Sequence, residues 1–107
     1  MIRVRFLIGN NRLTGFEISG HAFFAESGKD VVCAAVSSAA YMVANTVTEV
    51  IGASAEANAD DGKMSLMLKE ESEQCNALLK GFELHITELS KQYPQNIKVI
   101  YGGVKNA

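Results

Sequence analysis

Residues 30–51 read DVVCAAVSSAAYMVANTVTEVI, a run that is charged only at Asp30 and Glu49. The run is far longer than the usual strand of about five or six residues. Its apolar residues recur at spacings of three and four, which is the period of an α-helix. Because the run is apolar nearly all round, we expect a helix that is buried and central, ending at Gly52. The residues that carry this period are Val32, Val36, Ala40, Val43, Val47 and Val50.

Strand patterns flank this helix on both sides. Residues 2–8 and 13–19 alternate in polarity around Gly9-Asn10-Asn11, which predicts a β-hairpin. The remaining elements are a second hairpin over 54–58 and 64–68, a second helix over 70–93 that Pro94 ends, and a last strand over 97–101. The order ββαββαβ predicts an α+β fold with a mainly antiparallel sheet and two helices, the first buried and central.

The bulk properties limit the class of protein. At 107 residues, 48% of them hydrophobic, the chain is expected to form a single domain over 1–107. Its net charge of -2 is not the basic charge that is typical of proteins in direct contact with nucleic acid. We find no signal-peptide pattern at the start and no apolar run of about 20 residues, so we expect a cytoplasmic protein without membrane contact. The spacing of the two cysteines and two histidines gives no support for a metal site.

One thiol and one imidazole stand close together in the sequence. If Asp30 is the N-cap of the first helix, Cys33 falls in the first helical turn, where backbone N–H groups and the helix dipole favour a thiolate. We therefore expect the pKa of Cys33 to lie below the usual value of about 8.5, although the Asp30 carboxylate opposes this shift. His21 follows the second predicted strand, so it can converge with Cys33 as a general base.

The same residues also allow a purely structural interpretation. A cysteine in a helix rich in alanine and valine is often a small core residue, and a histidine after a strand is often solvated. Ser37 lies one turn after Cys33 and either contacts the site or bonds its own helix backbone. Cys75 lies on the apolar stripe of the second helix and is predicted to be core. Spacing alone leaves these alternatives open.

A resemblance to a known family favours the catalytic interpretation. Gly20-His21-Ala22, then Glu26-Ser27-Gly28-Lys29-Asp30, then Val31-Val32-Cys33-Ala34-Ala35-Val36-Ser37 closely resembles the signature of the ribosomal-processing cysteine protease family, Prp. The resemblance covers the whole chain in length and element order. It implies a homodimeric, cytosolic bacterial endopeptidase that needs no cofactor.

The resemblance also implies roles for individual residues. Cys33 is the expected nucleophile and His21 the expected base, with Asp30 and Ser37 in support. The residues expected to form a mobile loop that orders over substrate are Ala22, Phe23, Phe24, Ala25, Glu26, Ser27, Gly28 and Lys29. The implied substrate is the N-terminal extension of large-subunit ribosomal protein twenty-seven, cut after a Phe-Phe motif.

Three questions remain open at this point. Phe23 and Phe24 either pack on the neighbouring helix or a second copy, or fold into the empty substrate groove and inhibit the enzyme. The same reactive Cys33 also suits a thiol redox sensor. The chain also suits a non-catalytic ribosome-assembly factor that recognises its partner by a sheet edge.

Overall fold

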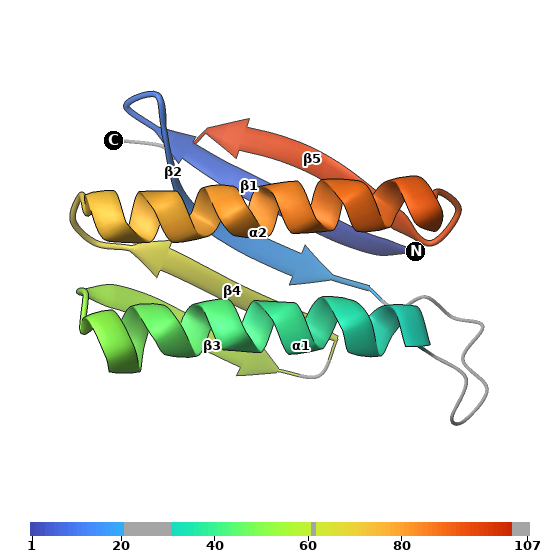
Figure 1. Ribbon diagram of the computed structural model, residues 1–107, viewed down its shortest axis with the longest axis horizontal. Coiled ribbons are helices and arrows are strands. Elements are labelled where there is room, and N and C mark those ends of the chain that lie inside the picture. Colours follow the sequence, from blue (N-terminus) through green and yellow to red (C-terminus); the bar gives the residue numbers. More distant parts are fainter. Residues whose placement is uncertain (21–30, 61, 104–107) are drawn as a thin grey trace.

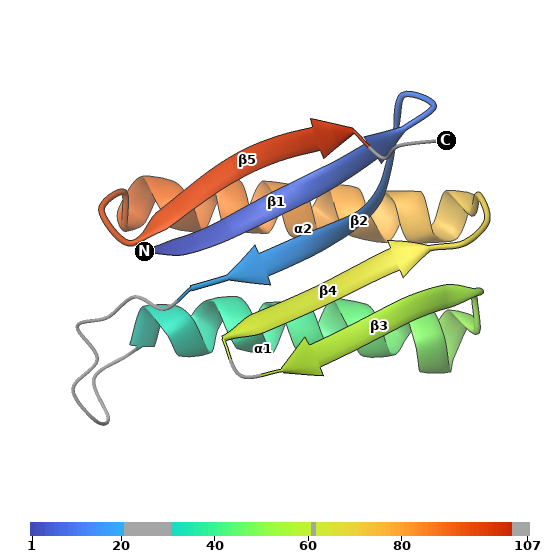
Figure 2. The ribbon, with the colours of Figure 1, turned by 180° about the vertical axis from the view of Figure 1, so that it is seen from behind.

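The computed structural model describes residues 1–20, 31–60 and 62–103, which form two layers. One layer is a five-stranded sheet in the order β3-β4-β2-β1-β5. The other layer consists of α1 and α2, which lie side by side on one face of the sheet (Figures 1 and 2). The elements are β1 (Ile2–Gly9), β2 (Arg12–Ser19), α1 (Val31–Asn45), η1 (Thr46–Ile51), β3 (Ala55–Asp60), β4 (Lys63–Leu68), α2 (Glu73–Gln92) and β5 (Ile97–Gly103).

Both predicted hairpins are present. β1 and β2 pair antiparallel and meet at Asn10 and Asn11, whose φ angles of 54° and 62° are in the left-handed region that asparagine tolerates. β3 and β4 form the second hairpin, with Ala55 opposite Leu68 at its open end. β4 then joins β2, so the two hairpins share one sheet.

The last strand makes the sheet mixed. β5 pairs in parallel with β1, and Ile97 lies opposite Ile2. The other strand pairs, β1–β2, β2–β4 and β3–β4, are all antiparallel. The α+β fold class and the mainly antiparallel sheet are therefore confirmed, with one parallel pair at the β1 side.

The core lies between the sheet and the two helices. Phe82 of α2 packs on Phe16 and Phe6 of the sheet, with ring centroids 4.8 Å and 5.7 Å apart. Cys75 is fully buried in this core, as predicted. Burying a large apolar side chain contributes about 1.5–3 kcal/mol. The fully buried residues with the largest side chains are Phe6, Phe16, Ile2, Leu66, Leu79, Ile86, Val4, Val32, Val36, Val43, Val47 and Cys75.

The expectation that the first helix is buried and central is wrong. α1 shares one face of the sheet with α2, and its inner residues, among them Val32 and Val36, reach the core. Its outer residues are exposed, with 61% of Val31 and 57% of Met42 accessible to solvent. The helix lacks charge on its exposed side as well as on its buried side, so composition alone suggested complete burial.

The sequence expectation that no segment is apolar enough to cross a membrane also needs correction. Judged by length and composition alone, the segment Val31–Ile51 is long and apolar enough to cross a membrane, with a mean hydropathy of 1.5. In this structure one side of the segment packs on the sheet. The core helix of a soluble protein can be equally long and apolar, so length and composition do not make this segment a membrane span. The segment ends as η1, a π-helical stretch in which the Thr48 hydroxyl donates to the Ala44 carbonyl at 3.1 Å.

Candidate active site

Cys33 lies in the first turn of α1. The helix is described from Val31, so the cysteine is its third residue and lies beside backbone N–H groups that have no carbonyl partner within the helix. Val32 and Val36 anchor this turn because both are almost fully buried against the sheet. Cys33 itself is half-buried at the edge of that contact. The thiol is therefore held on a rigid helix terminus and remains accessible.

A cavity of about 110 Å³ opens beside this thiol. The apolar side chains of Ile2, Ile18 and Met64 line it from the sheet, and Cys33 and Ser37 line it from α1. The other lining residues are Gly20, Val36, Tyr41, Asp60, Gly62 and Lys63. The site thus combines one reactive side chain with an apolar wall and a charged rim.

Gly20 sets the backbone position at the entrance of the 21–30 segment. Its φ of 87° lies in the left-handed region, and a Cβ there would overlap the carbonyl oxygen of Met1. Its N–H donates to the carbonyl of Gly62 in the β3–β4 turn at 3.1 Å. The residue that precedes His21 is therefore fixed by two neighbouring segments of the chain.

The structure brings only part of the predicted site together. Cys33 and Ser37, two of the candidate site residues, line one cavity. His21, Asp30 and the predicted loop, residues 22–29, lie outside the described residues. The Phe23-Phe24 hypothesis lies outside them as well. The roles of these residues stay predictions.

Several residues of the cavity were not among those predicted for the site. Tyr41 follows Cys33 by eight residues, which is two helical turns, so its spacing was a usable signal. Asp60, Gly62 and Lys63 carried no such signal, because they reach the cavity only through the pairing of β4 with β2. The sequence near Cys33 does not indicate a contribution from this distant turn.

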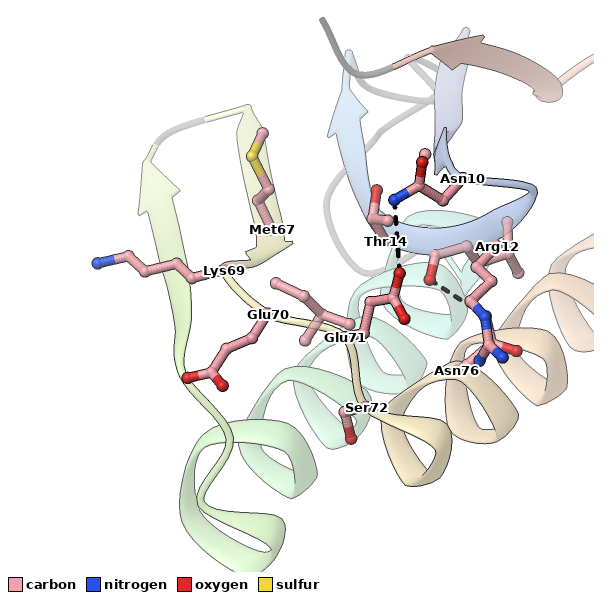
Figure 3. A pocket seen from close by; sticks show the side chains of 12 residues that line it. Asn10, Arg12, Thr14, Met67, Lys69, Glu70, Glu71, Ser72 and Asn76 are labelled. Carbon is pink, nitrogen blue, oxygen red and sulfur yellow. Dashed lines mark hydrogen bonds between the residues drawn. The ribbon is translucent and has the colours of Figure 1, made fainter. Parts of the chain in front are cut away.

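A second cavity, of about 200 Å³, lies at the opposite ends of β2 and β4. Figure 3 shows Asn10 of the β1–β2 turn pointing toward Glu71, with 3.4 Å between its amide nitrogen and the carboxylate. Asn76 of α2 donates to the Leu13 carbonyl at 3.2 Å. This cavity contains no thiol or imidazole. Across the described ranges, no group of three or more His, Cys, Asp or Glu residues is placed to hold a metal ion.

A third hollow, of about 360 Å³, lies on the outer side of the helix layer and is called the helix groove below. Met42 and Ala39 line it from α1, and Leu78 and Gly81 line it from α2. Val43, Ala77, Phe82 and His85 complete the lining. Among the described residues that line it, His85 is the only one with an ionisable side chain, so this part of the groove is almost free of charge.

Comparison with known proteins gives a consistent result. Residues 1–98 match the model of the family described as cysteine protease Prp. The ribosomal processing cysteine protease Prp of Bacillus subtilis (strain 168) is 27% identical over 94 residues, covering 81% of this chain and 84% of that protein.

Solved structures share the fold over nearly the whole chain. The ribosomal processing protease Prp from S. aureus, in complex with a covalently linked product peptide, matches with a TM-score of 0.87 at 23% identity. That match covers 95% of this chain and all of the other. SMU.848 from Streptococcus mutans matches with a TM-score of 0.79 at 28% identity, covering 97% of this chain and 96% of the other.

Proposed function

Since the chain belongs to the Prp family of cysteine proteases, we propose that it is an endopeptidase that cuts with a dyad of Cys33 and His21. The observation that carries the proposal is the position of Cys33, which is half-buried in the first turn of α1 and opens into a cavity. The positive end of the helix dipole stabilises a thiolate at such a position. The resemblance of residues 20–37 to the family signature assigns the base to His21.

The reaction follows from these two groups. His21 takes the thiol proton of Cys33, and the resulting thiolate attacks the scissile carbonyl carbon. A carbon–sulfur bond forms, and the carbonyl oxygen becomes an oxyanion. N–H groups of the first turn of α1 are suited to stabilise that oxyanion. When the carbon–nitrogen bond breaks, protonated His21 gives its proton to the leaving amine. Water, deprotonated by His21, then hydrolyses the thioester and restores the thiol.

The cavity favours an apolar side chain beside the scissile bond. Ile2, Ile18 and Met64 line it, and burial of apolar area there would supply binding free energy of about 25 cal/mol per Å². This lining supports cleavage after a Phe-Phe motif. We propose that the substrate is the N-terminal extension of large-subunit ribosomal protein twenty-seven and that the enzyme works in the cytoplasm without a cofactor. We expect it to contact neither nucleic acid nor a membrane directly.

We also propose that the active form is a homodimer that joins through the helix groove. A two-fold interface brings a surface against itself, so any charged residue near the axis meets its own copy. The helix groove is apolar, and residues 31–48, in α1 and η1, include no charged residue. A second copy is therefore the occupant proposed for it. Met42→Glu should convert a dimer into a monomer in light scattering; a native protein that is monomeric at all concentrations would disprove this assignment.

The central test is a cleavage assay on a peptide that contains Leu-x-Leu-x-Phe-Phe-Ala, hereafter the full probe. Native protein should cut after the second Phe, as located by mass spectrometry, and Cys33→Ala should not. His21→Ala should lose cleavage as well, because the dyad needs its base. A thiol sensor would keep oxidising Cys33 in the His21→Ala variant while cleaving nothing. A ribosome-assembly factor would leave the probe intact and bind ribosomal RNA in a salt-dependent way.

A further inference from the structure

The Cys33 cavity extends along one side of α1. Cys33, Ser37 and Tyr41 follow one another at intervals of four residues, and all three line it. Residues at this spacing lie above one another on a helix that rises 1.5 Å per residue. Tyr41 therefore lies roughly 12 Å along the axis from Cys33. The residue is 49% exposed, so its ring is available to a chain that lies along this side of the helix.

The residues of β3 that face the helix side of the sheet are alanines. Ala57 and Ala59 of β3 lie opposite Leu66 and Met64 of β4, and cross-strand partners project from the same face. Leu66 belongs to the core, so the two alanines face the helix side of the sheet. Both are exposed, and β3 is an edge strand. Ala59 precedes Asp60 and lies opposite Met64, and both of these residues line the cavity together with Tyr41. We call Ala57, Ala59 and Tyr41 the alanine shelf.

We propose that the alanine shelf binds the substrate segment upstream of the scissile bond, and that Tyr41 determines specificity by packing on the fourth residue before that bond. This inference rests on the proposed protease function. An extended peptide advances about 3.3 Å per residue, so roughly 12 Å corresponds to between three and four residues. With the scissile carbonyl at Cys33 and the upstream segment running along α1 toward Tyr41, the fourth residue upstream lies beside Tyr41.

The chemistry of the shelf also agrees with the upstream segment. Two alanine methyl groups and a phenol ring form an apolar surface, and the methyls leave room that longer side chains would fill. In the full probe the fourth residue before the cut is the Leu of Leu-x-Phe-Phe. Asp60 and Lys63 also line the cavity, and their charge makes them unsuited to that Leu. Tyr41 and the alanines are therefore its best apolar partners.

The first test compares Tyr41→Ala with Tyr101→Ala on two probes. Tyr101 is a matched control because this residue is 51% exposed and lies on β5, at the other edge of the sheet. Tyr41→Ala should raise KM for the full probe by roughly tenfold, the usual effect of losing one apolar contact of moderate size, and leave kcat nearly unchanged. On a probe shortened to x-Phe-Phe-Ala with its downstream residues kept, Tyr41→Ala should raise KM much less, because that probe lacks the Leu.

The second test fills the shelf. Ala59→Leu should raise KM for the full probe, whereas Asn58→Leu should not, because Asn58 projects from the other face of the same strand. Equal losses in Tyr41→Ala and Tyr101→Ala, or an equal loss on both probes, would refute the shelf.

If native protein cleaves neither probe, the proposed protease function fails. The shelf is then judged by fluorescence anisotropy of the labelled full probe on Cys33→Ala protein. There, adding Tyr41→Ala should weaken binding by the same factor, and an unchanged or unmeasurable affinity would refute the shelf as well.

Discussion

Gly15 lies against the backbone carbonyl of Leu66, so closely that a Cβ on Gly15 would overlap the Leu66 oxygen. The contact joins β2 to β4 at the centre of the sheet, where the two hairpins meet. Leu66 is fully buried and packs in the core, so neither strand can move away without opening that core. The absence of a side chain at position 15 is therefore a condition for the two hairpins to share one sheet.

Gly15→Ala should lower the free energy of unfolding by about 1–3 kcal/mol, the usual cost of forcing extra atoms into a packed region. Urea unfolding at one protein concentration measures it. Gly81→Ala is the matched control, because Gly81 lies in α2 with no atom near its missing Cβ. That change should stabilise by about 0.5–1 kcal/mol, since alanine favours a helix. Changes of the same sign in both variants would contradict the packing argument.

Gly20→Ala should reduce kcat at least tenfold if His21 is the base. The substitution introduces both a left-handed φ strain and an overlap with the Met1 carbonyl, so the backbone before His21 must shift. A displacement of about 1 Å at a catalytic group can cost about a hundredfold in rate. Gly52→Ala carries similar φ strain in open space, and it should lower stability while leaving kcat close to that of native protein. Steady-state kinetics on the full probe measures kcat for both variants. An equal loss of kcat in Gly20→Ala and Gly52→Ala would contradict the role given to Gly20.

Ser72→Ala should destabilise the protein by about 1 kcal/mol. The Ser72 hydroxyl accepts a hydrogen bond from the Cys75 N–H at 3.1 Å and so caps the N-terminus of α2. Ser38 is exposed in the middle of α1, and Ser38→Ala should change stability by less than about 0.5 kcal/mol. Thermal unfolding of the two variants tests this; an equal shift in Tm would show that the cap contributes nothing.

Tyr101 should ionise late in an alkaline titration. Its hydroxyl donates to Glu83 of α2 at 2.6 Å, and this bond, with partial burial and the negative charge of Glu83, raises the pKa of Tyr101 from 10.0 to about 12. Because the folded-state pKa is the higher one, the stabilisation is complete below about pH 10 and is lost as pH rises toward about 12. In a titration followed by phenolate absorbance, Tyr101→Phe should remove the transition at the highest pH. Glu83→Gln should move that transition to lower pH. An unchanged titration in Glu83→Gln would contradict the assignment.

Cys33 and Cys75 should differ sharply in reactivity. Cys75 is fully buried in the core, whereas Cys33 is half-buried beside its cavity. Iodoacetamide should therefore modify only Cys33 in native protein and both cysteines after unfolding, as mass spectrometry of the peptides would show. Rapid modification of Cys75 in folded protein would mean that the core opens locally.

The strands were predictable because their residues alternate in polarity, and alternation is a local property. The predicted strand over 13–19 differs from β2 by only one residue at its start. Two features depended on long-range packing and were not predictable in this way. No local pattern indicates that β5 lies parallel to β1. The uncharged sequence of α1 also does not distinguish a fully buried helix from a helix whose exposed side is apolar, as it is at Met42.

The candidate site likewise contains residues that local sequence patterns indicate and residues that only long-range packing brings in. The spacing of four residues was enough to place Cys33 and Ser37 on one side of one helix, and both line the same cavity. Tyr41 continues that row at a spacing of eight residues, but its sequence context favoured a packing role. Gly62 and Lys63 belong to a turn that is brought to the thiol only by sheet formation, so no local pattern in the sequence identified them.

The parallel pairing of β1 with β5 has a consequence for how a nascent chain acquires this structure. β1 finds its first neighbour, β2, within a few residues, but its second neighbour begins at Ile97, ninety-five positions after Ile2. Such a contact has a high contact order and forms late. Until then β1 is an open edge that can pair with other chains. During synthesis the protein must therefore keep this edge from aggregation while nearly its whole length is being made.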